Sequence, residues 1–209
     1  MSSITDSAVT ILRQCGVSGE DLLAIYPYGS RVYGTFSEKS DRDYIVVYSG
    51  DDPSNDSQQH DSRDGSLSVH TYSEKSWKNH LANHKIFAME CHSIMPMVMF
   101  PFQLHLPTLR KEISAKASHS WVKCKKKIEV ENDYYTAIKS LFHSFRIPTF
   151  GIQIARYGRV VDFTEASPLW EDEFKELLNE KPSWEEIAEH YKQRHNKLMS
   201  EFRKVAEKE

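Results

Sequence analysis

The sequence predicts an α+β protein with a small mixed β-sheet in its first half and a bundle of helices in its second. Two patterns predict this fold class. Short runs of apolar and β-branched residues, which are typical of strands, fall before residue 73. Longer segments with apolar side chains at helical spacing follow from Thr108 onward. We therefore expect an α/β core over residues 1–106, a helical domain over residues 107–209, and a cleft between them.

Three strands are predicted in the core, over Leu22–Tyr26, Asp43–Tyr48 and Leu67–Tyr72. The first should end at Pro27, because proline has no N–H group to donate to a sheet. Residues 50–65 carry five aspartates and no apolar side chain, which indicates a solvated loop. These aspartates lack the spacing of a calcium loop, so we do not expect them to bind a metal.

Helices are predicted over residues 5–14 with Thr5 as the cap, 30–33, 73–83, 85–93, 108–127, 132–146 and 150–157, and in two segments that begin at Ser167 and Ser183. Thr108 should cap the first long helix. Pro148 should interrupt the next one, and residues 160–163 should form a short extended piece. Ser183 and Glu186 have the spacing of a capping box.

The composition indicates a soluble, cytoplasmic protein. Three cysteines without a CxxC pair are typical of reduced thiols inside the cell. The N-terminus lacks the pattern of a signal peptide, and the most apolar stretch, Ile94–Phe102, is too short to span a membrane. The formal net charge of −3 gives the whole molecule no nucleic-acid signature, so any such site must be local.

The stretch most informative about function runs from Tyr26 to Tyr48. Gly29-Ser30 follows the first strand and opens a helical turn, a place where backbone N–H groups can meet phosphate oxygens. Arg31 next to it can add a fixed positive charge. Asp41 and Asp43 stand two residues apart at the start of the second strand, so both carboxylates should point to the same face.

Two carboxylates on one face suit a divalent ion. Magnesium prefers oxygen ligands and is usually held by one or two carboxylates together with substrate phosphates. Asp41 and Asp43 are therefore the predicted metal ligands and catalytic residues, with Mg²⁺, or Mn²⁺ in its place, as the cofactor. An isolated DxD is more often a pair of turn residues; the preceding Gly-Ser and the flanking strands favour the metal site here.

Gly29-Ser30 with Ser40-Asp41-Arg42-Asp43 resembles the GS…DxD signature of the DNA polymerase beta-like nucleotidyltransferase superfamily. Two further segments, HKIFAME from His84 and KSLFHSFRI…FGIQIA from Lys139, resemble the RNA-ligase-associated predicted nucleotidyltransferases of phage and cellular genomes. The resemblance covers most of residues 20–165. It implies that Gly-Ser holds the triphosphate of an NTP and that the two aspartates bind magnesium.

Members of this superfamily commonly add a third acid on a neighbouring strand. The candidate strand here offers Ser68 and His70 at the alternate positions and no carboxylate. Asp64 precedes it and Glu74 follows it. Glu90 is favoured, because an isolated acid in an apolar segment needs a partner or a metal when it is buried.

The helical half supplies positive charge. Residues 110–127 carry seven lysines and arginines against one acid, Glu112. Lys123 from this segment, and Lys139, His143 and Arg146 on one stripe of the next helix, are the predicted substrate-binding residues, together with Gly29, Ser30 and Arg31. The alternative is an ordinary solvated helix face.

These patterns predict a metal-dependent nucleotidyltransferase that moves a nucleoside monophosphate from an NTP, ATP being one candidate, to an acceptor. The acceptor is either an RNA end, in RNA repair or processing, or a protein hydroxyl; the residues do not choose between them. The alternative is a non-catalytic nucleotide- or RNA-binding protein with an incomplete metal site.

Overall fold

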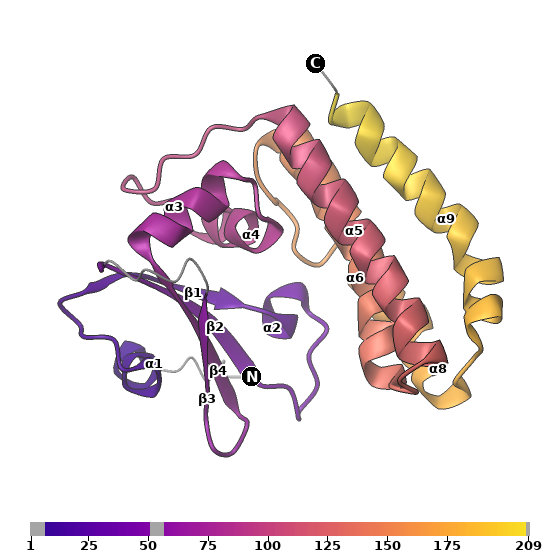
Figure 1. Ribbon diagram of the computed structural model, residues 1–209, viewed down its shortest axis with the longest axis horizontal. Coiled ribbons are helices and arrows are strands. Elements are labelled where there is room, and N and C mark those ends of the chain that lie inside the picture. Colours follow the sequence, from indigo (N-terminus) through magenta and orange to yellow (C-terminus); the bar gives the residue numbers. More distant parts are fainter. Residues whose placement is uncertain (1–6, 51–56, 208–209) are drawn as a thin grey trace.

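The structure is a computed structural model that describes residues 7–50 and 57–207 (Figure 1). A four-stranded sheet is formed by β1 (Leu22–Tyr28), β2 (Arg42–Tyr48), β3 (Gln58–Asp61) and β4 (Leu67–Ser73), in the order β1-β2-β4-β3. β2 and β4 are parallel, and the two outer strands are antiparallel to their neighbours. A mixed sheet followed by helices confirms the predicted fold class.

The sheet differs from the prediction at both edges. β1 continues through Pro27, which pairs with Tyr44, because an edge strand tolerates a residue without an N–H group. β3 lies inside the predicted loop of residues 50–65. Its side chains are mostly exposed, so it shows no apolar alternation, and it is held by antiparallel pairing with β4.

Helices cover both faces of the sheet (Figure 1). On one face, α1 (Ala8–Cys15) packs Ile11 among the apolar side chains of β2 and β4. On the other, α3 (Glu74–Ala82) and α4 (Ile86–Ile94) contribute Trp77 and Ala88 to the core. The predicted cap Thr5 lies outside the described residues; the cap of α1 is Ser7, whose Oγ accepts from the Thr10 backbone N–H at 3.2 Å.

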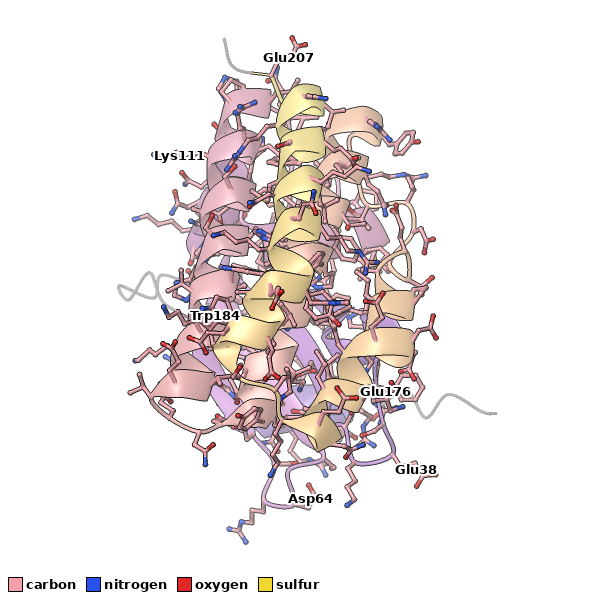
Figure 2. All side chains as sticks on the ribbon, turned by 90° about the vertical axis from the view of Figure 1, so that its right-hand side faces the viewer. Glu38, Asp64, Lys111, Glu176, Trp184 and Glu207 are labelled. Atoms are coloured by element: carbon pink, nitrogen blue, oxygen red, sulfur yellow. The ribbon has the colours of Figure 1, made fainter. Side chains whose placement is uncertain are left out.

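The second half contains three long helices that lie side by side, α5 (Leu106–Glu129), α6 (Tyr134–Tyr157) and α9 (Trp184–Val205). Between α6 and α9 lie α7 (Ser167–Leu169), a π-helical turn η1 (Trp170–Phe174) and α8 (Lys175–Glu180). Figure 2 shows α9 on the outer face of this bundle, with Trp184 at its start. Gly151 lets the helices approach closely, since a Cβ there would lie 2.9 Å from Ile113 and Phe202.

The helix boundaries correct three predictions. α5 is capped by His105 and not by Thr108. α6 continues through Pro148, because the burial of Ile147 and Phe150 on either side outweighs the lost hydrogen bond. Residues 160–163 form no strand: the backbone N–H groups of residues 161 and 162 donate to Oε1 of Gln153, at 2.7 and 2.9 Å. The capping box of Ser183 and Glu186 is confirmed.

Across the described residues, none of the helices has the length and apolar character needed to cross a bilayer.

Candidate active site

Gly29 joins the edge strand β1 to the short helix α2 (Ser30–Tyr33). Its backbone has φ 77° and ψ −158°, a conformation that is open to glycine and strained for other residues. A Cβ atom on Gly29 would lie 1.9 Å from Oδ2 of Asp43. The missing side chain therefore lets the Asp43 carboxylate rest against the Gly-Ser turn.

The antiparallel pairing of β1 with β2 explains this contact. Tyr28, the last residue of β1, pairs with Asp43, the second residue of β2. Gly29-Ser30 and Asp43, thirteen or fourteen residues apart in the sequence, are brought to one corner of the sheet. The structure thus joins the two motifs that define the predicted site.

Asp41 and Asp43 repel one another. Burial is the main cause, and the charge of Asp41 the second, of the rise in the pKa of Asp43 from 3.8 to about 6; the nearby Lys139 opposes the rise. A divalent cation bound by both carboxylates would offset this repulsion, and carboxylate oxygens are ligands that such a cation prefers. Asp41 and Asp43 therefore fit a magnesium ion chemically.

Both halves of the chain line a cavity of about 430 Å³ beside these aspartates. The core contributes Gly29, Ser30, Thr35, Asp41 and Asp43, and the bundle contributes Lys116, Ser120, Lys139, His143 and Arg146. Aromatic and aliphatic side chains complete the wall: Tyr28, Tyr33, Ile86, Phe87, Phe142, Ile147 and Trp170. Carboxylates on one side thus face cations on the other.

In the part of the chain that the structure describes, two of the cavity-lining cations are not held in ion pairs. Neither Lys116 nor Lys139 has a carboxylate partner among the described residues. The Lys139 ammonium lies 4.7 Å from the ring centroid of Tyr135, which is exposed at the start of α6. These lysines are available to an anionic ligand.

Lys123 and the lysines beyond it do not line the cavity. Lys123 is exposed on α5, although its charge reaches His143. Lys125, Lys126 and Lys127 form ion pairs with Glu129, Glu131 and Asp133. The last three lysines of this basic segment are therefore compensated by acids, and Lys116 is the member of the segment that lines the cavity.

Glu90 has a different environment from the one expected of a metal ligand. It is fully buried on α4, where Oε1 accepts from Arg146 Nη1 at 2.5 Å and Oε2 accepts from the Tyr33 hydroxyl at 2.7 Å. Both oxygens are engaged, and Glu90 is not among the cavity-lining residues. The partner that compensates its burial is an arginine.

Arg31 is also placed away from the cavity wall. Its guanidinium donates to the backbone carbonyls of Ser40 at 2.9 Å and Asp41 at 3.1 Å. It lies 5.0 Å from the ring centroid of Phe36. In this position Arg31 fastens the loop that carries Asp41 to α2, and its charge also opposes the rise in the pKa of Asp43.

The adjacent strand β4, which is described in full, carries no third acid. Ser68 faces Asp43 on β4, and the next residue of the same row is Asp61 on β3, which accepts from the Ser68 hydroxyl at 2.7 Å. Asp64 bonds within its own turn, and Glu74 pairs with Lys78. In residues 7–50 and 57–207, no three His, Cys, Asp or Glu side chains converge as a metal cluster.

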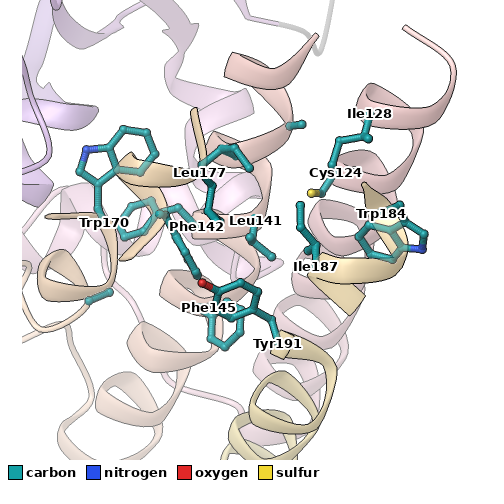
Figure 3. Packing of buried hydrophobic residues seen from close by; sticks show 14 residues of the cluster. Cys124, Ile128, Leu141, Phe142, Phe145, Trp170, Leu177, Trp184, Ile187 and Tyr191 are labelled. Atoms are coloured by element: carbon teal, nitrogen blue, oxygen red, sulfur yellow. The ribbon is translucent and has the colours of Figure 1, made fainter. Parts of the chain in front are cut away.

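Trp170 is a cavity-lining residue that none of the sequence patterns above predicted. It is mostly buried, contacts Phe142 edge to face with centroids 5.7 Å apart, and lines the cavity. Figure 3 shows Trp170 at the end of its cluster, on the side of the N-terminal half. A π-helical turn begins at Trp170, and such turns are frequent at functional sites. Asp61 was not predicted to lie near Asp43, because it belongs to the polar segment that we expected to be a loop.

No protein-family model and no curated protein matches the chain. Among solved structures, the chain is similar to a nucleotidyltransferase-like protein from Exiguobacterium sibiricum 255-15. The match covers 95% of this chain and 72% of the other, with 14% identity and a TM-score of 0.31. A TM-score this low does not indicate a function for the chain.

Proposed function

We propose that the protein is a metal-dependent nucleotidyltransferase, which transfers a nucleoside monophosphate from an NTP to an acceptor and releases pyrophosphate. The observation that carries the proposal is the corner where Asp43 rests against Gly29, beside Asp41 and opposite Lys116 and Lys139 in one cavity. A magnesium-bound triphosphate matches this arrangement, because it brings a cation to the carboxylates and negative charge to the lysines.

Each group has a defined part in the proposal. Asp41 and Asp43 would hold the ion, which supplies charge neutralisation at the phosphates when it is bound. The Gly29-Ser30 backbone and the Ser30 hydroxyl would place the triphosphate, and Lys139 would bind its far oxygens. Catalysis would then consist mainly of positioning and of electrostatic stabilisation by groups already in place.

The aromatic side of the cavity suits the nucleoside. Trp170 and Phe142, which contact one another, give the cavity an apolar wall, and Thr35 and Ser120 contribute hydroxyl-bearing side chains to the same cavity. Stacking on such a wall is tolerant of the base, since every base has a π face. The proposal therefore extends to NTPs in general, ATP among them.

Two acceptors remain in the proposal, an RNA end and a protein hydroxyl. The resemblance to nucleotidyltransferases associated with RNA ligases supports RNA. A long RNA contact along α5 has little support, because Lys125, Lys126 and Lys127 are paired with acids. An RNA terminus bound at the cavity itself is compatible with the charges of Lys116, Lys123 and Lys139.

The test is incorporation of label from α-³²P NTPs with Mg²⁺ or Mn²⁺ into RNA ends, added proteins and the chain itself. Asp41→Asn and Asp43→Asn should abolish incorporation. Asp21→Asn, which makes the same change at the opposite end of β1, should not. Lys139→Met should weaken NTP binding about tenfold or more, whereas Lys125→Met, which removes an ion-paired lysine, should leave it unchanged.

A non-catalytic binding protein is the alternative, and the missing third carboxylate motivates it. It predicts that NTPs raise the melting temperature while no acceptor is labelled. If no NTP changes the melting temperature with either metal, both the nucleotidyltransferase and the non-catalytic nucleotide-binding protein are refuted.

A further inference from the structure

His143 lies on α6 at the wall of the cavity, between Lys139 and Arg146. The Nε–H group of Arg146 donates to Nδ1 of the His143 ring at 3.2 Å. Among the described residues, no group hydrogen-bonds Nε2 of His143. Since Nδ1 faces Arg146, the other edge of the ring, which carries Nε2, is left for the cavity.

This hydrogen bond fixes the position of the ring proton. An arginine side chain has donors and no acceptor, so Nδ1 must accept and cannot itself carry a proton. The proton of the neutral ring is therefore on Nε2. Protonation of Nδ1 would break the bond and place a second positive charge against the guanidinium.

The groups that face the ring reinforce the neutral form. Arg146 and Lys139 come from α6 and Lys123 from α5, and all three are cations. Burial first, and these three charges next, hold the pKa of His143 well below its usual range. Arg146 is in turn held by Glu90 at 2.5 Å and by the ring of Tyr33, whose centroid lies 3.8 Å from its Cζ atom.

We infer that Arg146 is a positioning residue that holds His143 as a neutral Nε2–H donor, directed at a phosphate oxygen of the nucleotide. The direction toward phosphate rests on the proposed function; the tautomer does not. The same tautomer excludes His143 as the general base, because Nε2 already carries a proton and Nδ1 is occupied by Arg146. Deprotonation of the acceptor must then be carried out by another group.

The tautomer can be measured directly on the full chain. In protein labelled with ¹⁵N-histidine, long-range ¹H–¹⁵N spectra at pH 7 distinguish protonated from unprotonated ring nitrogens, and His143→Gln identifies the signal. We expect an unprotonated Nδ1 and a protonated Nε2, while the exposed His190 should show averaging between tautomers. A protonated Nδ1 in His143, alone or in an imidazolium ring, would overturn the inference.

The role of Arg146 is tested by the double variant Glu90→Gln/Arg146→Met, which removes both buried charges together. The His143 signals should then shift toward those of a tautomer mixture. Glu90→Gln alone keeps the arginine and should keep the tautomer. An unchanged His143 spectrum in the double variant would show that Arg146 does not set it.

The donor role is tested by binding of a non-hydrolysable NTP analogue. His143→Gln can place an N–H group near the position of Nε2 and should bind within about threefold of wild type; His143→Asn cannot reach it and should bind about tenfold more weakly. Equal binding by His143→Asn and wild type would refute the donor role. If the wild type binds no NTP, the proposed function fails, and the spectra still decide the tautomer.

Discussion

The buried pair of Glu90 and Arg146 gives the sharpest prediction for stability. The two side chains are 1% and 4% exposed, and they join α4 to α6. Arg146→Met should destabilise the fold by about 3–5 kcal/mol, because it leaves a buried carboxylate with the Tyr33 hydroxyl as its remaining partner. Glu90→Gln should cost about 1–3 kcal/mol, since a glutamine can still accept a hydrogen bond.

The double variant Glu90→Gln/Arg146→Met should be more stable than Arg146→Met alone. Removing both charges leaves neither uncompensated, so we expect a coupling free energy of about 2 kcal/mol or more. Urea unfolding followed by circular dichroism, with slopes compared between variants, measures all four free energies. Additive single effects, or an Arg146→Met variant within about 1 kcal/mol of wild type, would refute the assignment of this pair as an ion pair isolated from water.

Two further predictions concern the corner of the sheet. Gly29→Ala should abolish NTP binding and lower the free energy of unfolding by more than about 2 kcal/mol, because the new Cβ collides with Asp43. The control is Gly158→Ala, at a similar positive φ with open space around it, which should cost only about 1 kcal/mol. Thermal unfolding measures both changes. Asp43→Asn should stabilise the metal-free chain by about 1–2 kcal/mol at pH 8, after allowance for partial exposure, because ionising a carboxyl with a pKa of about 6 is unfavourable. That advantage should vanish as the pH falls through 6 toward 4, where the wild-type carboxyl gains its proton, and a difference that stays constant over this range would contradict it.

The sequence was sufficient to predict the fold class and to single out the Gly-Ser and DxD motifs, because these follow from local patterns; the pairing of β1 with β2 then brings the two motifs to one corner. Gly29, Asp41 and Asp43 lie at the ends of strands whose apolar runs are unmistakable. β3 was missed because an exposed edge strand needs backbone partners and not an apolar face. The predicted helix break at Pro148 was wrong because tertiary packing stabilises α6 through a residue that disfavours a helix.

For Glu90, the sequence predicts that the buried acid has a compensating partner but does not identify that partner. A lone acid in an apolar segment must have a compensating partner, and that part of the reasoning was sound. A metal and an arginine satisfy the requirement equally well, and the arginine lies 56 residues away. Only the packing of α4 against α6 identifies it. Trp170 could not be predicted as a cavity residue, because an apolar side chain there is equally consistent with the bundle core, to which it also belongs.

Tyr33 has a consequence for dissecting the protein. This last residue of α2 donates its hydroxyl to Glu90, stacks under Arg146, packs edge to face on Phe150, and accepts at its carbonyl from the Ser167 hydroxyl. Three of these neighbours lie beyond residue 106. A fragment that ends there would retain Gly29, Ser30 and both aspartates but lose the scaffold that orients them. We therefore expect that any fragment with the Gly29 and Asp43 corner intact must include the helices.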